Sequence, residues 1–391
     1  MVEVDSSNVW GAISLPDLLG VEGNLSAAHR ALLDSEGRFR AVVPEETDPE
    51  VLRILKTAEK IREENDVLVV LGAQAECLCA RGVTELIPGR EKNPKGKESL
   101  PEILFAGSDF SSRQWNRLMK QLEGKRFSLC VLAGREAQLE TLVALRILKW
   151  TLERRYGTDG ARERIFAAAE GNFARMAREE GWCLFEKTDR DVFGPFRPGV
   201  LLVLAAAGLD IGAFLRGGRE LLAQCSLLSY DNPLWLYAGS RYALCRRGKN
   251  KELLYGFETD FRRLADWWQT MTAREDANGP FPVGAVSGGA QLPQGSREDA
   301  FVTLVSFSSP EKKVRILEDA RDIDGLNALA GRTLEELQEI RRQTLTEAAA
   351  DAGTGVIGIC FETVKEETLG ALTCFFSLSA RLSAGISGET G

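Results

Sequence analysis

The sequence predicts an α/β fold in which two domains follow one another, each built on a parallel sheet. Three observations carry this prediction. The chain has 391 residues, of which 44% are hydrophobic, so it can bury one large core or two. Short apolar segments alternate with amphipathic segments along most of the chain. Repeated strand, helix and strand units form parallel sheets whose two faces are covered by helices.

The first domain is expected over residues 45–190. Residues 1–44 before it are typical of an irregular arm with one short helix, and acidic and proline residues after Val43 then open an amphipathic helix. Apolar segments bounded by turn residues predict the strands, with helices between them. These strands are expected at 67–71, 102–107, 127–133, 164–170 and 182–187.

The second domain is expected over residues 191–391. Long apolar and amphipathic stretches predict its helices, and shorter apolar runs predict its strands. Helices are expected at 200–215, 232–248 and 261–268, and from about Thr333 and about Lys365; strands are expected at 251–257, 301–307 and 355–361. Gly, Pro and polar residues make the loops at 88–101 and 284–296 the most mobile parts that we expect.

Charge and composition exclude several classes of function. The formal net charge is -8 and the isoelectric point is near 5.2, so no basic surplus exists for general nucleic-acid binding. No run approaches the apolar length of a membrane span, and the acidic start is unlike a signal peptide, so we expect a cytoplasmic protein without membrane contact. The eight cysteines form no CxxC pair, which predicts reduced, mostly buried thiols and no metal site.

Histidine chemistry is also disfavoured. Histidine is the usual proton shuttle near neutral pH, and this chain has one, His29. It lies in "NLSAAHRALL", which predicts a surface helix near the N-terminus. We therefore expect a structural or solvated role for His29, and no catalysis of the Ser-His-Asp or Cys-His kind.

Several stretches carry a resemblance to a known family. They are "DVLVVLG", "LRILKWTLERRYG", "DNPLWLYAGSRYALCRRGK", "LADWW" and "ETLGALTCFFSLSA", in this order. From about residue 45 to about residue 385 the chain resembles bacterial glucose-6-phosphate isomerase. The resemblance implies two SIS-type (flavodoxin-like) three-layer α/β/α domains with C-terminal helices, a homodimer, and no cofactor or metal. It also implies interconversion of glucose 6-phosphate and fructose 6-phosphate through an enediol.

The first departure from the family lies in the loop after the strand at 67–71. The family reads Gly-Ile-Gly-Gly-Ser there, and its serine helps to hold a phosphate at a helix start. Here Gly72 remains, Gln74 and Ala75 replace the inner glycines, and Glu76 takes the serine position. A carboxylate about 4 Å from a phosphate charge costs about 4 kcal/mol at an effective dielectric constant of about 20. We interpret Glu76 as a carboxylate that complements the positive end of a helix.

The second departure lies after the strand at 127–133. The family reads Ser-Lys-Ser-Gly-Thr-Thr-Thr-Glu there, whereas this chain reads "AGREAQLE". Arg135 and Gln138 stand in the former hydroxyl ladder, and only Glu140 matches. We expect Arg135 to form an internal ion pair with Glu76. The alternative is that Arg135 contacts an anionic ligand.

The remaining departures remove the groups that would move protons. Pro195 stands where the family has an arginine that stabilises the enediolate, and Arg197 follows two residues later. The family's glutamate base falls near Gly295, beside Gln294. Nearby Glu298 and Asp299 match other family positions, and we expect them to be solvated charges. The family's ring-opening histidine has no counterpart after 308, and no lysine follows "FFSLSARLSA".

Three hypotheses follow. The leading one is a catalytically silent relative of glucose-6-phosphate isomerase that acts as a binding or interaction protein. The second is a divergent enzyme for a small sugar or sugar-phosphate ligand, with a rebuilt site in the cleft between the domains. The third is a conventional isomerase with relocated residues. The residues that would line the former substrate cleft are Gly72, Gln74, Glu76, Arg135, Glu136, Gln138, Arg197 and Gln294.

Overall fold

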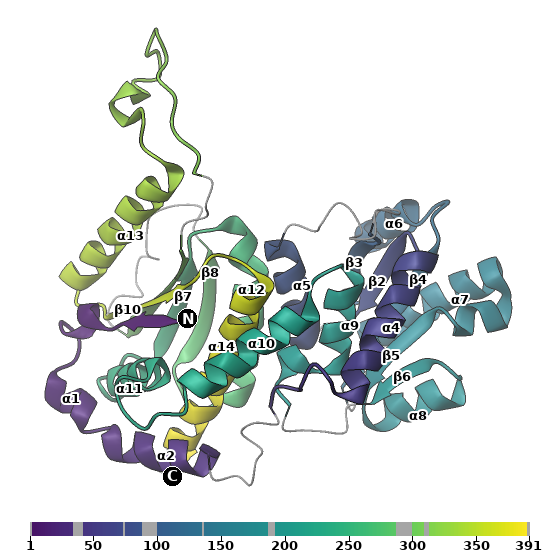
Figure 1. Ribbon diagram of the computed structural model, residues 1–391, viewed down its shortest axis with the longest axis horizontal. Coiled ribbons are helices and arrows are strands. Elements are labelled where there is room, and N and C mark those ends of the chain that lie inside the picture. Colours follow the sequence, from purple (N-terminus) through teal and green to yellow (C-terminus); the bar gives the residue numbers. More distant parts are fainter. Residues whose placement is uncertain are drawn as a thin grey trace. The chain divides into compact units, whose positions relative to one another are not determined.

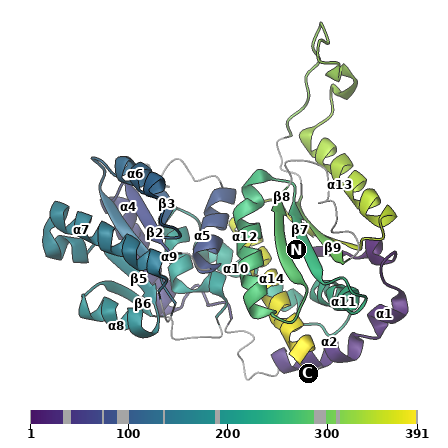
Figure 2. The same cartoon turned by 180° about the vertical axis from the view of Figure 1, so that it is seen from behind.

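The chain divides into two compact units, which are described separately. The computed structural model describes residues 2–33, 42–72, 75–87, 100–134, 137–186, 192–286, 299–308 and 313–388. Ser35–Glu220 form one unit, and Met1–Asp34 together with Leu221–Gly391 form the other (Figures 1 and 2). The boundary that we expected after residue 190 does not coincide with these units, which divide after Glu220, and residues 198–206 pack on strands of the Ser35–Glu220 unit.

The Ser35–Glu220 unit contains a parallel sheet in the order β3-β2-β4-β5-β6. Each strand lies within one residue of a predicted segment at either end. β2 and β4 are buried along their whole length, as the apolar runs predicted, whereas β3 at the edge is partly exposed. The strands are β2 (Val67–Leu71), β3 (Glu102–Ala106), β4 (Phe127–Leu132), β5 (Ile165–Ala169) and β6 (Cys183–Glu186).

Helices cover both faces of this sheet. One face packs on α6 (Ser112–Gln121), α7 (Leu139–Arg162) and α8 (Gly171–Glu179), whose apolar residues share a core with Val69 and Val131. The other face packs on α9 (Pro198–Ala206), which contacts α4 (Pro49–Glu64) and α5 (Ala75–Leu86). α9 is apolar on every side and fully buried after its first residue, so it is a central element of this unit.

The single helix that we predicted over 200–215 is two helices. α9 ends before Gly208, whose φ of +85° is a left-handed conformation that favours glycine. Asp210 then accepts a hydrogen bond from the amide N of Ala213 over 3.0 Å, and α10 (Ile211–Gln224) begins. The apolar composition hid this break, because both segments are hydrophobic.

The other unit also contains a mostly parallel sheet, in the order β1-β10-β9-β7-β8. The strands are β1 (Glu3–Asp5), β7 (Lys251–Gly256), β8 (Phe281–Val286), β9 (Ala300–Phe307) and β10 (Val356–Phe361). β1 is antiparallel to β10, and the other pairs are parallel. The sequence did not predict β1 or β8. β1 has three residues, and β8 contains Pro282 and Gly284, which an edge strand tolerates.

Two of our predictions about the first residues and the last helix need correction. Residues 2–33 are more regular than an irregular arm, since they hold β1, α1 (Leu15–Leu19) and α2 (Glu22–Leu33). α14 (Glu366–Gly388) is long and apolar enough to cross a membrane, which the sequence reading overlooked. Most of it is buried against α2, α11 (Pro233–Arg246) and α12 (Arg262–Glu275), as in the core helix of a folded unit.

A buried charged cluster joins the elements of this unit. The guanidinium of Arg241 on α11 contacts Glu252 Oε2 at 2.7 Å and Asp276 Oδ2 at 3.2 Å, and it donates to Ser383 Oγ over 2.7 Å. Tyr237 also donates to Glu252. Arg241 and Asp276 are each 2% exposed and Glu252 is fully buried. The cluster therefore fixes α11, β7, α14 and the end of α12 to one another, and it includes charges that are costly to leave unpaired.

His29 does not lie on a surface helix, as the sequence suggested, but in the core. Its side chain is fully buried, and its Nδ1 accepts a hydrogen bond from Trp235 Nε1 over 2.6 Å. Burial lowers the pKa of His29 to about 4, against the opposing effect of a backbone hydrogen bond at Cys225. The structural role that we expected is confirmed, and the neutral imidazole is an internal acceptor.

The stability of the protein should therefore fall at mildly acidic pH. The unfolded chain protonates His29 near its ordinary pKa of 6.5, whereas the folded chain resists protonation until about pH 4. This contribution is complete above pH 6.5 and is lost as the pH falls toward 4. We expect the free energy of unfolding, measured with urea, to fall by about 2 kcal/mol more between pH 7 and pH 5 in the wild type than in a His29→Gln variant. Equal losses in the two proteins would contradict the assignment.

Candidate functional site

The candidate site lies at the carboxyl ends of β2 and β4, within the Ser35–Glu220 unit. β3 follows β2 in sequence and lies on one side of it, whereas β4 lies on the other side. In open parallel sheets, ligands bind at the carboxyl ends of the strands beside such a switch in strand order. Gly72, Glu76, Gln138 and Arg197 are the predicted site residues that the structure describes in this unit.

Gly72 lets the chain turn tightly against the neighbouring strands. Its amide N donates to the carbonyl oxygen of Ala106 over 3.3 Å, and its φ is +153°. A Cβ atom at this position would lie 2.8 Å from the carbonyl oxygen of Leu132. A side chain would require the backbone of β4 to move, so this glycine is needed for the close approach of β2 and β4.

Glu76 forms a buried ion pair at this edge. It lies in the first turn of α5 and is 7% exposed, and its Oε1 accepts a hydrogen bond from Arg197 Nη1 over 3.0 Å. Arg197 precedes the first residue of α9, and its Nε also donates to the carbonyl oxygen of Val192 over 3.3 Å. The helix N-terminus and the guanidinium therefore both stabilise the carboxylate. The position in the first turn of α5 agrees with our interpretation that Glu76 complements the positive end of a helix.

The turn before Arg197 packs directly beside this pair. Gly194–Phe196 form a short 3-10 helix that contacts α5, and Pro195 and Phe196 are buried. A Cβ atom at Gly194 would lie 3.7 Å from Glu76 Cγ. Pro195 has neither a charge nor a donor to direct toward a ligand. The polar groups that the turn contributes to this edge come from Arg197, which is paired with Glu76.

Arg197 is a partner of Glu76 that the sequence did not suggest. We expected Arg135 to pair with Glu76, and Arg135 lies outside the described residues, so that pair stays a prediction. Gln74, Glu136 and Gln294 also lie outside them. The sequence contained no direct signal for the pair, since Arg197 lies 121 positions after Glu76.

The side chains of Gln138, a predicted site residue, and of Thr141 are described at the start of α7. Gln138 precedes the first residue of α7 and is exposed, and its side chain makes no capping hydrogen bond. Thr141, in the first turn, is buried, and its hydroxyl donates to the carbonyl oxygen of Gly107 over 3.1 Å. That hydroxyl is directed to the end of β3, where it joins α7 to the sheet.

The cysteines of α5 are not poised as nucleophiles. Cys77 and Cys79 are both buried, as are Cys130, Cys225 and Cys374, which confirms that the thiols are mostly buried. Burial raises the pKa of the Cys77 thiol to about 12 and also raises that of Cys79 well above its ordinary value. A thiol must ionise before it can attack, so these residues contribute packing to this edge.

Asp299, which the sequence predicted to be a solvated charge, lies at the surface and forms an ion pair. Its carboxylate lies 2.7 Å from Lys251 Nζ, and both side chains are nearly half exposed. The hydrogen bond from Lys251 lowers the pKa of Asp299 below its usual value. Such a carboxylate is a weak base for taking a proton from a sugar carbon. Glu298 lies outside the described residues.

The sequence reading did not single out Glu258, which has an unusual environment in the other unit. Glu258 follows β7, which lies between β8 and β9 at the corresponding switch in strand order. Burial, and then the charge of Asp260, raise the pKa of Glu258. Glu258 lines a cavity of about 660 Å³ together with Ser306, Ser308 and Arg342. A carboxylate directly after a predicted strand was the available signal.

Comparisons with known proteins place these observations in context. The chain is 33% identical over 358 residues to the glucose-6-phosphate isomerase of Bacillus cereus (strain AH187), covering 87% of this chain and 79% of that one. It is 31% identical over 412 aligned positions to the glucose-6-phosphate isomerase of Bacillus cytotoxicus, covering 99% and 91%. No family model matches the chain.

Solved structures share the fold at lower identity. A hypothetical protein from Thermus thermophilus superposes with a TM-score of 0.82 at 20% identity, covering 98% of this chain and 94% of that one. A glucose-6-phosphate isomerase from Chlamydia trachomatis superposes with a TM-score of 0.73 at 11% identity, covering 95% and 81%. The predicted fold class, two SIS-type α/β/α domains with parallel sheets, is confirmed.

Proposed function

Because the chain belongs to the glucose-6-phosphate isomerase family, we propose that it keeps the scaffold of that family without its turnover and acts as a binding or interaction protein. The observation that carries this proposal is the buried ion pair between Glu76 and Arg197 at the carboxyl edge of β2. The resemblance places a phosphate-holding serine at position 76. A paired carboxylate has taken its place.

The ion pair opposes phosphate binding in two ways. Arg197 already neutralises Glu76, so it does not supply a free positive charge to a sugar phosphate. A phosphate that drew Arg197 away would take from the buried Glu76 carboxylate the guanidinium that is paired with it. Breaking a buried pair in this way costs about 3–5 kcal/mol, before the repulsion between the carboxylate and the phosphate is added.

Proton transfer is also poorly supported by the residues described. Pro195 occupies the position of the family's arginine, and the histidine of this chain is buried in a core with a pKa of about 4. Asp299 is held as an anion by Lys251. Isomerisation of an aldose to a ketose requires an acid and a base placed on the substrate. These three residues do not supply them.

An isomerase assay tests the proposal. Purified protein at micromolar concentration would be given fructose 6-phosphate, and formation of glucose 6-phosphate would be followed with glucose-6-phosphate dehydrogenase. We expect no turnover above the rate without protein. An active isomerase from a relative, diluted into the same mixture, is the positive control. Turnover that rises in proportion to the concentration of this chain would end the proposal.

Glu258 favours a second candidate function, a divergent sugar or sugar-phosphate isomerase with a rebuilt site. A carboxyl whose pKa is raised by burial is better matched to proton transfer near neutral pH than an ordinary glutamate. A thermal-shift screen with sugar phosphates, free sugars and amino sugars tests this candidate, because a ligand at 100 times its Kd stabilises by about 2.7 kcal/mol. A stabilising sugar whose effect survives Glu258→Gln would count against this second site.

We also propose that the protein is a homodimer, as in the sequence reading. Residues 313–333 project from the sheet of their unit and lead into α13 (Leu334–Asp351) (Figure 1). Hydrogen bonds of 2.9 and 2.8 Å between Asp319 and Asn327 hold this projecting segment in shape. Leu317 and Ile323 are nevertheless 85% and 78% exposed. Large apolar side chains on an ordered projection suit a contact with a second subunit.

Light scattering after size exclusion tests the dimer. Wild type is expected at twice the chain mass, and a Leu317→Asp, Ile323→Asp double variant is expected to shift toward the monomer because each aspartate places a charge in an apolar contact. Leu139→Asp, at another exposed apolar position, is the matched control and should leave the mass unchanged. A monomeric wild type, or a double variant that stays dimeric, would contradict this proposal.

A further inference from the structure

β3 has one edge that pairs with no strand in the described part of the chain. In its pairing with β2, the amide N of Glu102 donates to the carbonyl oxygen of Asp66, and the carbonyl oxygen of Ala106 accepts from the amide N of Gly72. Because alternate residues of a strand direct their backbone groups to opposite sides, those of Ile103 and Phe105 face the free edge. No backbone partner for either residue lies in the described part of the chain.

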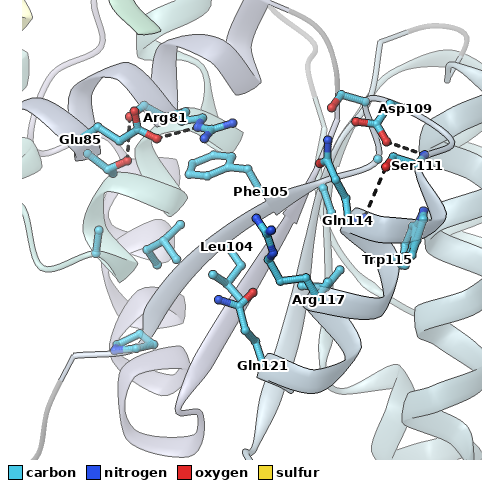
Figure 3. A pocket seen from close by; sticks show the side chains of 18 of the residues that line it. Arg81, Glu85, Leu104, Phe105, Asp109, Ser111, Gln114, Trp115, Arg117 and Gln121 are labelled. Atoms are coloured by element: carbon cyan, nitrogen blue, oxygen red, sulfur yellow. Dashed lines mark hydrogen bonds and ion pairs between the residues drawn. The ribbon is translucent and has the colours of Figure 1, made fainter. Parts of the chain in front are cut away.

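A groove of about 1260 Å³ runs along this edge. It lies within the Ser35–Glu220 unit, between α5 on one side and α6 on the other (Figure 3). Phe105 projects to the α5 side, where the Arg81 guanidinium lies 5.6 Å from the centre of its ring. Leu104 and Trp115 add apolar surface on the α6 side. The groove therefore contains the outward backbone groups of β3 and is lined by apolar and polar side chains from α5 and α6.

The described residues of the groove offer more positive than negative charge, although the protein as a whole is acidic. Arg113 and Arg117 are both exposed on α6, a helix without acidic residues, and neither has an ion-pair partner among the described residues. The two carboxylates of the groove are engaged locally: Glu85 pairs with Arg81 at 2.6 Å, and Asp109 accepts from the amide N of Ser111 over 2.7 Å.

We propose that this groove binds an extended, acidic segment of a partner protein, which pairs with β3 as an additional strand. The unpaired groups of Ile103 and Phe105 would provide the main-chain hydrogen bonds, and Arg113 and Arg117 would provide charge complementarity. A second copy of this chain is a poorer occupant, because a two-fold axis would bring each basic α6 toward its own equivalent. The inference does not depend on whether the chain turns over sugar phosphates, since the groove contains none of the predicted site residues.

Fluorescence anisotropy with a labelled heptapeptide tests this inference. The probe alternates acidic residues with valine, and two matched peptides separate the causes of binding. One carries lysine in place of each acidic residue, and the other carries N-methyl groups on alternate amides, which block strand pairing. We expect saturable binding of the acidic probe and at least about tenfold weaker binding of both controls. Failure of the acidic probe to saturate, or equal binding of the lysine peptide, would overturn the proposal.

Variants of the full chain locate the binding. The double variant Arg113→Glu, Arg117→Glu should bind the acidic probe at least about tenfold more weakly than wild type does. The control is Arg175→Glu on α8, at a 70% exposed arginine outside the groove, and it should bind the probe as wild type does. Ile103→Pro removes one outward amide and should abolish binding, while an unchanged Tm shows that β3 still folds. Binding that survives Ile103→Pro in a folded protein, or tighter binding of a single-stranded DNA decamer, would refute strand addition. If Ile103→Pro instead converted a dimeric protein to a monomer, the edge of β3 would be the contact with a second copy of this chain.

Discussion

The Arg241→Met variant is expected to lose about 3–5 kcal/mol of unfolding free energy at neutral pH. Methionine keeps much of the side-chain volume but removes the charge that Glu252 and Asp276 share. Both carboxylates are buried, so water cannot replace the guanidinium without opening the core. The expected loss is a large fraction of the stability of an ordinary domain, and urea denaturation followed by circular dichroism would measure it.

The pH dependence of this loss separates charge from packing. Burial already raises the pKa of Asp276 against the effect of Arg241, and removing the arginine should raise it further. The loss should therefore shrink between pH 8 and pH 5, as the buried Asp276 of the variant takes up a proton. Arg274→Met, which breaks an exposed pair with Glu275, should cost less than about 1 kcal/mol. A loss in Arg241→Met that is independent of pH would show that packing, not charge, accounts for it.

The Arg197→Met variant is expected to lose about 3 kcal/mol of unfolding free energy, because it removes the guanidinium that pairs with the buried Glu76 carboxylate at the edge of β2. Adding Glu76→Gln to the same chain should restore most of the stability, since the chain then buries neither of the two charges. The double-mutant cycle should therefore give an interaction energy of about 2–3 kcal/mol. Urea unfolding of the four proteins at pH 7 would provide it.

A surface pair is the matched control for this cycle. Arg178 and Glu186 contact one another in the same unit, with side chains 53% and 42% exposed. A double-mutant cycle on this pair should give an interaction energy of less than about 1 kcal/mol, because water and salt screen exposed charges. An interaction energy for Glu76 and Arg197 as small as that of this pair would mean that the former phosphate edge is open to solvent, and it would weaken the functional proposal.

Local patterns were sufficient to predict the strands that lie inside a sheet. β2 and β4 are continuous apolar runs because helices cover both of their faces, and their predicted bounds were confirmed to within one residue. β1 and β8 could not be found in the same way. β1 is three residues long and is stabilised by its pairing with β10, and β8 is an edge strand with Pro282 in it. Whether such segments form strands depends on their pairing with other strands more than on their local propensity.

At the candidate site, too, local patterns predicted the position of a residue but not its contacts with distant residues. Glu76 could be predicted at the start of a helix, because the strand that ends at Leu71 and the following apolar positions fix α5. Its pairing with Arg197 could not, since the two residues meet through the packing of α9 on α5. His29 shows the same limit. The residues around it predict a helix, but the indole of Trp235 that buries it lies 206 positions away.

A crystal of the protein soaked in glucose 6-phosphate tests the central claim most directly, because it shows the carboxyl edge of β2 in the presence of the family's substrate. The account predicts that Glu76 and Arg197 stay paired, with no phosphate on the amides that follow Gly72. A sugar phosphate seated at that helix start, with Arg197 turned from Glu76 toward the phosphate, would contradict it.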